Sequence, residues 1–313
     1  MKRKLIFLLL AAAVTLAAAQ PVPVIFDTDM GNDIDDALAL AMLHALESRG
    51  EIKLVAVTLT KDNPWAARYV SAVNTFYGRA GIPLGAVKDG AAKQEGKYTR
   101  QAIESGGWKW SDANAEAVAL LERTLKAQAD GSVVVIQVGF STNLARLLAE
   151  PGGRDLIAKK VKLLSLMAGD FTSHGPEYNV REDVKACQKL VAEWPGEMVW
   201  SGFEVGRTIK YPARSIGHDF GWAPRHPVVD GYKHYMKFPY DRETWDLTAV
   251  LYAARPEAGY FTLSEPGRVA VDDKGFTKFE AAAGGRHRYL KVDEVQRARI
   301  LEAMIWLASQ PAR

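Results

Sequence analysis

Short, nearly continuous apolar runs alternate along this chain with longer segments in which apolar residues recur every three or four positions. The first pattern is typical of strands buried on both faces, and the second is typical of amphipathic helices. The predicted strands are residues 23–27, 53–59, 132–138, 161–167 and 198–200, and the predicted helices are residues 35–48, 64–77, 115–127, 143–149, 181–192, 244–254 and 292–308. This alternation predicts an α/β fold with an open, mostly parallel sheet that helices cover on both faces.

Residues 1–19 have the pattern of a secretory signal peptide. Lys2, Arg3 and Lys4 precede an apolar stretch that ends in three alanines, the usual order of charged start, apolar segment and cleavage site. The apolar stretch is too short and too rich in alanine for a typical membrane-spanning helix. We therefore expect export to a bacterial periplasm, no stable membrane association after cleavage, and a single domain over residues 20–313.

The charge balance makes some classes of partner unfavourable. Without residues 1–19 the chain has 37 Lys and Arg against 37 Asp and Glu, so its formal net charge is 0. A neutral chain has no net attraction for nucleic acid or anionic lipid, and we expect a small-molecule ligand. The single cysteine, Cys187, lies in a helical pattern and has no cysteine partner, so we expect a buried structural thiol.

Candidate chemistry is concentrated where the first predicted strand meets the first predicted helix. Residues 27–36 read Asp-Thr-Asp-Met-Gly-Asn-Asp-Ile-Asp-Asp, with five carboxylates. Asp27 and Asp29 share one face of the strand, and Asp35 and Asp36 open the helix. So many like charges at one turn repel one another, and a hard divalent cation, which binds oxygen ligands, would relieve this repulsion. Asp27 is expected to be a structural hydrogen-bond acceptor instead.

Polar residues also follow the other predicted strands. They lie at residues 60–63, 138–143 and 168–170, and residues 244–246 place a further carboxylate at a helix start. In open α/β sheets the ligand binds beyond the carboxyl ends of the strands, so we expect these segments to meet at one site. Asn63 precedes Pro64 and could cap the helix that begins there, with or without a second role in the site.

These motifs resemble, in the same order, those of the inosine-uridine-preferring nucleoside hydrolases. Residues 27–38 resemble the aspartate signature of that family, and the resemblance spans most of residues 22–257. It continues through Asn63, Val138-Gly139, Met167-Ala168-Gly169, Glu177-Tyr178-Asn179 and Trp245-Asp246. The resemblance implies a Ca²⁺-dependent enzyme of nucleoside salvage that hydrolyses the N-glycosidic bond of ribonucleosides to base and ribose. It also implies a nucleoside as the small-molecule partner and the possibility of a homo-oligomer.

The resemblance assigns a role to each matching residue. Asp29 would contact Ca²⁺ and act as the general base on its bound water, and Asp36 would be the bidentate ligand. Val138 would offer its backbone carbonyl to the cation, and Asp246 would bind both the cation and ribose. The residues expected to hold ribose hydroxyls are Asp35, Asn63, Glu177 and Asn179.

The chain departs from the common family pattern at two places. It has two extra residues between Asp29 and Asp35, so Asp33 could take the role of Asp35. Trp245 stands where many members have a histidine that protonates the leaving base. A tryptophan there resembles the purine-preferring branch, in which the indole stacks on the base; the alternative is a buried core aromatic. His174 could serve as the acid, although a lone loop histidine is more often only solvated.

Two other functions fit part of the sequence. In a haloacid-dehalogenase-type phosphatase, Asp27 would be the nucleophile, Mg²⁺ would replace Ca²⁺, and a hydroxyl of residues 141–142 and the acidic pair 272–273 would complete the site. That scheme leaves the pair Asp35 and Asp36 without a role, and residues 272–275 fit a hairpin turn better. A periplasmic nucleoside- or ribose-binding protein could share the pocket without turnover.

Overall fold

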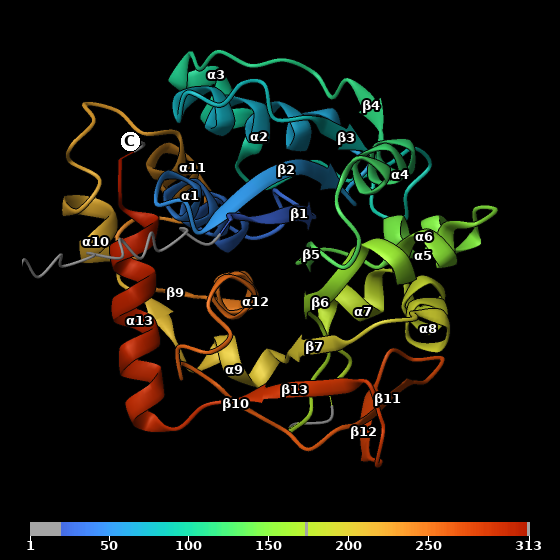
Figure 1. Ribbon diagram of the computed structural model, residues 1–313. Coiled ribbons are helices and arrows are strands. Elements are labelled where there is room, and N and C mark those ends of the chain that lie inside the picture. Colours follow the sequence, from blue (N-terminus) through green and yellow to red (C-terminus); the bar gives the residue numbers. More distant parts are fainter. Residues whose placement is uncertain (1–19, 173–174, 312–313) are drawn as a thin grey trace, which may run out of the picture.

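The computed structural model describes residues 20–172 and 175–311, and Figure 1 shows their arrangement. The predicted signal peptide lies outside these described residues. The strands are β1 (Val22–Thr28), β2 (Ile52–Leu59), β3 (Leu84–Ala86), β4 (Ala115–Glu116), β5 (Val133–Gln137), β6 (Val161–Met167), β7 (Met198–Ser201), β8 (Lys210–Tyr211), β9 (Arg242–Glu243), β10 (Thr262–Leu263), β11 (Gly267–Val271), β12 (Thr277–Ala281) and β13 (His287–Lys291).

Helices separate most of the strands. They are α1 (Asp35–Ser48), α2 (Pro64–Phe76), α3 (Thr99–Gly106), α4 (Ala117–Ala127), α5 (Thr142–Ala149), α6 (Gly153–Lys160), α7 (Tyr178–Glu182), α8 (Val184–Glu193), α9 (Phe203–Arg207), α10 (Ala213–His218), α11 (Pro227–Tyr235), α12 (Trp245–Ala254) and α13 (Glu294–Ala308). Among the described residues, no helix is both long and apolar enough to cross a lipid bilayer.

One large sheet organises the molecule, in the strand order β12-β11-β13-β7-β6-β5-β1-β2-β3-β4. All neighbours from β13 through β7 to β4 pair in parallel, whereas β11 pairs antiparallel with β12 and β13. From β1 the chain first builds the sheet outward through β2, β3 and β4, and it then returns to β5 on the other side of β1. This reversal beside β1 is a topological switch point, where open α/β sheets bind their ligands.

Helices cover both faces of the sheet, as predicted. Along β1, Val24 and Phe26 belong to one apolar core and Ile25 belongs to the other, because successive side chains of a strand point to opposite faces. Helices α1, α12 and α13 pack together on the first face, and α4, α5 and α8 pack on the second (Figure 1). The predicted single-domain α/β fold with an open, mostly parallel sheet is confirmed.

The predicted element boundaries are close to those observed, with one clear difference. Helix α1 and strand β6 have the predicted bounds, but the predicted helix 181–192 is divided into α7 and α8. The break lies at Asp183, whose backbone leaves the helical region (φ −148°, ψ 72°) and whose side chain accepts a hydrogen bond from the Ala186 amide. Asp183 therefore caps a new helix instead of continuing the previous one.

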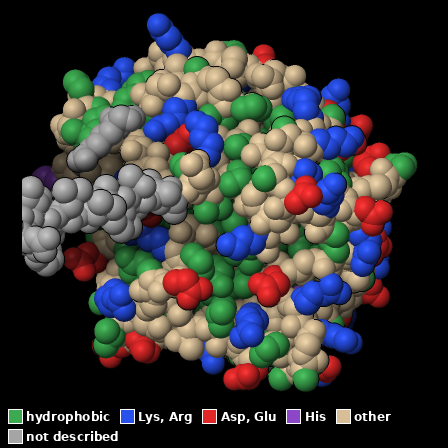
Figure 2. Space-filling model, in the orientation of Figure 1, with side chains coloured by type: hydrophobic (Ala, Val, Ile, Leu, Met, Phe, Trp, Pro, Cys, Tyr) green, Lys and Arg blue, Asp and Glu red, His purple; other side chains and the backbone are tan. Residues whose placement is uncertain are grey.

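Cys187 lies in α8 with no exposed surface, as predicted for a structural thiol. Burial raises the pKa of this thiol to about 12, so it is not a nucleophile at neutral pH. On the face that Figure 2 shows, acidic and basic side chains of the described residues are interspersed without a large patch of one sign. This distribution agrees with the balanced charge of the sequence.

Candidate active site

The turn from β1 into α1 brings the acidic residues together. Gly31 adopts a left-handed backbone (φ +113°), and a Cβ atom there would meet Cγ2 of Thr99 at 3.0 Å, so glycine suits this position best. The chain then enters α1, whose first turn contains Asp35 and Asp36. Carboxylates at a helix start interact favourably with the helix dipole, and each of these two residues is only 1% exposed.

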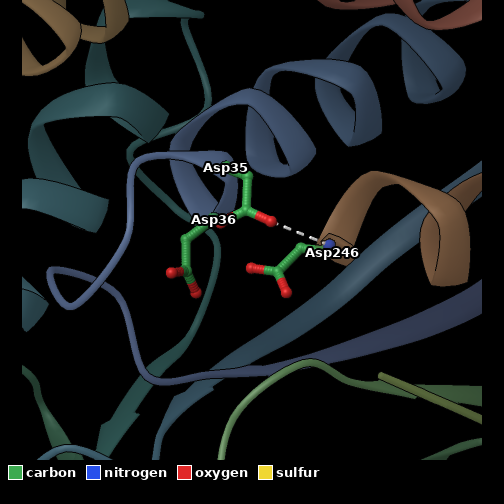
Figure 3. A group of neighbouring side chains, drawn as sticks. All are labelled: Asp35, Asp36 and Asp246. Carbon is green, nitrogen blue, oxygen red and sulfur yellow. Dashed lines mark hydrogen bonds between the residues drawn. The ribbon is translucent and has the colours of Figure 1, made fainter. Parts of the chain in front are cut away.

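Asp246 joins Asp35 and Asp36 from the other end of the sequence. It lies in the first turn of α12, and its backbone amide donates to Oδ2 of Asp35 at 3.0 Å. One carboxylate oxygen from each of the three residues lies within 4.8 Å of the others. Figure 3 shows the three side chains gathered at the starts of the two helices. Two helix starts that are 211 residues apart therefore present their carboxylates to the same point.

The electrostatics of this group favour a bound cation. Burial, followed by repulsion from neighbouring carboxylates, raises the pKa of Asp35, Asp36 and Asp246 well above the ordinary range. In the described part of the chain, none of the three forms an ion pair with a lysine or arginine. The donors are all hard oxygen atoms, so the group fits a divalent cation such as Ca²⁺.

Asp29 lines the same cavity but lies outside the closest group of three. Its Oδ2 accepts a hydrogen bond from Nδ2 of Asn32, and Oδ1 of Asn32 accepts one from the ammonium of Lys61. Burial raises the pKa of Asp29 to about 6, although Asn32 and Lys61 act in the opposite direction. A buried carboxylate with a pKa near neutrality is suited to proton transfer.

Asp33, the other candidate for the role of Asp35, pairs with a guanidinium. Nε of Arg242 donates to its Oδ1 at 2.9 Å, and Nη2 of Arg242 donates to its Oδ2. Asp33 is therefore neutralised at the mouth of the cavity, whereas Asp35 belongs to the carboxylate group. Both Asp33 and Asp35 line the cavity, and which of them contacts ribose stays a prediction.

A cavity of about 380 Å³ lies over these carboxylates. Its size and its mixture of apolar and polar walls are typical of a small-molecule site. The structure brings all but one of the predicted site residues into its lining: Asp29, Asp35, Asp36, Val138, Glu177, Asn179, Trp245 and Asp246. The predicted convergence of the strand ends is thus observed at the switch point beside β1.

Glu177 and Asn179 are buried, so their side chains belong to the folded interior and are not part of a solvent-exposed loop. Glu177 accepts hydrogen bonds from the amides of Gly169, Asn179 and Val180, and burial raises its pKa to about 7. Nδ2 of Asn179 donates to the carbonyl of Val138 at 2.9 Å. These contacts join the ends of β5 and β6 to the start of α7 and fix both side chains in the cavity wall.

Asn63 is the predicted site residue that does not line the cavity. Its Oδ1 accepts a hydrogen bond from the Trp65 amide at 3.0 Å, which caps α2. Of its two predicted roles, the structure shows the cap and does not bring the side chain to the site. Asn32 lines the cavity and was not predicted, because its position depends on how the longer turn folds.

Trp245 forms part of the cavity wall beside Phe203. The two rings are stacked, with centroids 5.3 Å apart and planes at 20°, and Nε1 of Trp245 donates to the Phe203 carbonyl at 2.9 Å. The guanidinium of Arg242 lies 5.2 Å from the Trp245 ring centroid. Trp245 is half-buried, so it is not an aromatic residue of the closed hydrophobic core. Neither Phe203 nor Arg242 was predicted, since no motif marked them.

Asp27 has a different environment from Asp29. It has no exposed surface, does not line the cavity, and accepts hydrogen bonds from Thr58 at 2.6 Å and Asn143 at 2.8 Å. The prediction of a structural acceptor is therefore confirmed, and the nucleophile of the phosphatase scheme is not at the cavity. Asp272 accepts from the amides of Lys274 and Phe276 in the hairpin turn between β11 and β12. His174 lies outside the described residues.

Comparisons with known proteins agree with this geometry. The family model described as inosine-uridine preferring nucleoside hydrolase matches residues 24–302. A plant nucleoside hydrolase has 18% identity and a TM-score of 0.75 over 93% of this chain and 100% of its own. A purine-preferring ribonucleoside hydrolase from Gardnerella vaginalis has 18% identity and a TM-score of 0.74 over 93% of this chain and 99% of its own.

A third solved structure gives the same fold. An inosine-uridine preferring nucleoside hydrolase from Bacillus anthracis has 18% identity and a TM-score of 0.71 over 92% of this chain and 99% of its own. A comparison with curated proteins gives no match. The solved structures show a shared fold, and the match of the family model extends over most of the sequence. The chain therefore belongs to the inosine-uridine preferring nucleoside hydrolase family and is an N-glycosyl hydrolase.

Proposed function

We propose that this enzyme hydrolyses the N-glycosidic bond of ribonucleosides in a Ca²⁺-dependent reaction, in a salvage role. The observation that carries the proposal is the buried group of Asp35, Asp36 and Asp246, which forms one wall of a cavity of about 380 Å³. A cation among three carboxylates held this close would relieve their mutual repulsion, and Ca²⁺ accepts such oxygen ligands readily. Val138 and Asp29 line the same cavity and would complete the ligand set.

The protein groups divide the chemistry among them. A bound Ca²⁺ would lower the pKa of a water molecule and hold ribose hydroxyls in place. Asp29, a carboxylate in the cavity wall, would take the proton from the attacking water. Cleavage develops positive charge on the sugar, and carboxylates of the cavity wall would stabilise that charge. Asp35, Glu177 and Asn179 would orient the sugar through its hydroxyls.

We further propose a preference for purine nucleosides. Trp245 and Phe203 both line the cavity and stack on each other, which places aromatic rings beside a bound base. A purine that leaves as a protonated base would gain about 0.5–2 kcal/mol from contact with such a surface. The fold of the purine-preferring enzyme from Gardnerella vaginalis is similar to that of this chain.

Sugar release from five nucleosides tests the function. Inosine, adenosine, guanosine, uridine and cytidine are incubated with the enzyme, and reducing sugar is measured with and without a chelator. We expect sugar to be released fastest from the purine nucleosides. The release should stop when the chelator is added and recover when Ca²⁺ is restored. Release that is unaffected by chelation would contradict the role of the cation, and release of phosphate from phosphomonoesters alone would favour the phosphatase scheme.

A binding protein without turnover is the remaining alternative, and a single variant separates it from the enzyme. Asp29→Asn keeps the size and hydrogen-bonding capacity of the side chain but cannot accept a proton. We expect this variant to bind nucleoside and lose sugar release. Equal sugar release by the variant and the wild type would remove Asp29 from the mechanism.

Two further proposals concern the location and the assembly of the protein. We propose that residues 1–19 direct export to the periplasm, which N-terminal sequencing of the protein recovered from that compartment would test. A start at Gln20 supports export, and an intact Met1 in the cytoplasm contradicts it.

We also propose that the enzyme forms a homo-oligomer. Light scattering during size-exclusion chromatography would then show a mass above 34.4 kDa, the mass of one full chain.

A further inference from the structure

Lys61 is a fully buried lysine that is connected to Asp29 through one amide side chain. It follows the end of β2, and none of its surface is exposed. Its ammonium donates to Oδ1 of Asn32, whose Nδ2 donates to Oδ2 of Asp29. Lys61, Asn32 and Asp29 therefore form a chain of hydrogen bonds that runs from the end of β2 to the carboxylate beyond the end of β1.

The two ends of this chain fix the orientation of the Asn32 amide. An ammonium can only donate hydrogen bonds, and an ionised carboxylate can only accept them. The oxygen of Asn32 must therefore face Lys61, and its nitrogen must face Asp29. A flipped amide would lose both contacts at once, so Asn32 holds one oxygen of Asp29 in a single arrangement.

Stability alone gives a poor explanation of Lys61. A buried ammonium is costly unless it is paired, and within the described chain Lys61 forms no ion pair with an aspartate or glutamate. Its charge interacts at longer range with Asp29 and Asp36. The lysine thus lies where it acts on the carboxylates of the cavity, through Asn32 at short range and through its charge at longer range.

The turn between β1 and α1 provides these contacts. Asn32 and Asp33 are neighbours in this turn, and each contacts a cationic side chain from a distant segment. Asn32 contacts Lys61 after β2, and Asp33 contacts Arg242 in β9. The turn is therefore attached at two neighbouring residues, which limits its movement over the cavity.

We propose that Lys61 and Asn32 are positioning residues for Asp29, and that they hold its carboxylate in the orientation that the cation and the attacking water need. The proposal rests on the proposed function, in which Asp29 is the general base. Neither residue needs to touch the substrate for this role. Groups that orient a metal ligand or a base from behind contribute about 10–100-fold to metal affinity or activity.

Two variants and a matched control test this proposal. Lys61→Met removes the ammonium and keeps a long, unbranched side chain, and Asn32→Ala removes the amide. The control is Lys93→Met, because Lys93 has 63% of its side chain exposed, pairs with Asp62 and Asp89, and does not line the cavity. For each protein we would measure kcat, KM, the free energy of unfolding, and the Ca²⁺ affinity of the metal-free protein by calorimetry.

We expect both site variants to lose about 10–100-fold in kcat, in Ca²⁺ affinity or in both, while KM changes little. The double variant should lose no more than Asn32→Ala alone, because the two residues act in one chain of contacts. Lys93→Met should match the wild type in all four measurements. If Lys61→Met does not fold, Asn32→Ala, at a partly exposed turn, decides the question.

Several results would overturn the proposal. Wild-type kcat and Ca²⁺ affinity in both variants would do so. Losses that add in the double variant and follow the free energy of unfolding would show a general structural role instead. If the wild type binds Ca²⁺ but cleaves no nucleoside, the proposed function fails. The Ca²⁺ affinities of the variants then test by themselves whether Lys61 and Asn32 position Asp29.

Discussion

Asp27 and Asp29 lie two residues apart at the end of β1, yet their surroundings differ in kind. Asp27 accepts hydrogen bonds from the neutral side chains of Thr58 and Asn143 behind the cavity. Asp29 lines the cavity and raises the pKa of Asp36 by its charge. Both are buried carboxylates with raised pKa values. Burial alone therefore does not identify a catalytic carboxylate; the groups that surround it do.

The same substitution at the two positions should give the largest contrast. Asp29→Asn removes the proposed base, and we expect kcat to fall by about 10²–10⁴-fold. Asp27→Asn keeps an oxygen that can accept from Thr58 and Asn143, so we expect kcat within about threefold of the wild type. Steady-state sugar release by both variants tests this. A comparable fall in kcat in the two variants would contradict the proposed difference between Asp27, which has neutral neighbours, and Asp29 in the cavity.

The pH dependence of stability should report on Asp27 in the metal-free protein. Burial raises its pKa from 3.8 to about 7 in the folded state. As the pH rises from 4 to 7, the unfolded chain loses this proton before the folded protein does, so this group alone should lower the free energy of unfolding by about 3 kcal/mol. Below the unfolded pKa both states are protonated, and the full stability is present.

Denaturant unfolding between pH 4 and pH 8 in a chelator would measure this dependence. The side chain that Asp27→Asn introduces cannot ionise, so this variant should lose less stability over the same pH range than the wild type. Curves of equal slope for the variant and the wild type would show that Asp27 does not titrate in its pocket.

Ca²⁺ should stabilise the wild type much more than it stabilises the variant Asp246→Asn. A ligand at 100 times its Kd raises the free energy of unfolding by about 2.7 kcal/mol when it binds only the folded state. Asp246→Asn removes one of the three converging carboxylates and should abolish most of this gain, whereas Asp27→Asn should keep it. Thermal unfolding with and without Ca²⁺ measures the gain. A full gain in Asp246→Asn would place the cation elsewhere.

The smallest predicted effect concerns Asn63, for which the sequence left two roles open. Its side chain caps α2, so Asn63→Ala should lower the free energy of unfolding by about 0.5–2 kcal/mol. Because Asn63 does not line the cavity, we expect KM for the nucleoside to stay unchanged. A raised KM without a loss of stability would restore the ribose contact that the resemblance assigned to this residue.

Much of the fold was predictable because its signals are local. The alternation of buried strands and amphipathic helices predicted the layers, and Asp35 and Asp36 marked the start of α1. The break between α7 and α8 was missed, since Asp183 fits a helical pattern as well as it fits a cap. The hairpin of β11 and β12 was found only at its turn, because its strands are short and half exposed.

The candidate site was predictable where family motifs marked it and unpredictable where distant contacts form it. Eight of the nine predicted site residues line the cavity. The sequence could not decide between Asp33 and Asp35, because the pairing of Asp33 with Arg242 joins residues 209 positions apart. Lys61 was likewise not assigned, since its contact with Asn32 depends on the shape of the longer turn.

The central claim is that carboxylates from α1 and α12 bind one Ca²⁺ at the switch point of the sheet. A crystal structure of the protein in Ca²⁺, with an anomalous difference map, tests it most directly. We predict one strong peak about 2.3–2.6 Å from oxygens of Asp36 and Asp246, beside Asp35. A crystal saturated with Ca²⁺ that shows no anomalous peak among these carboxylates, or shows its peak at a different site, would contradict the account.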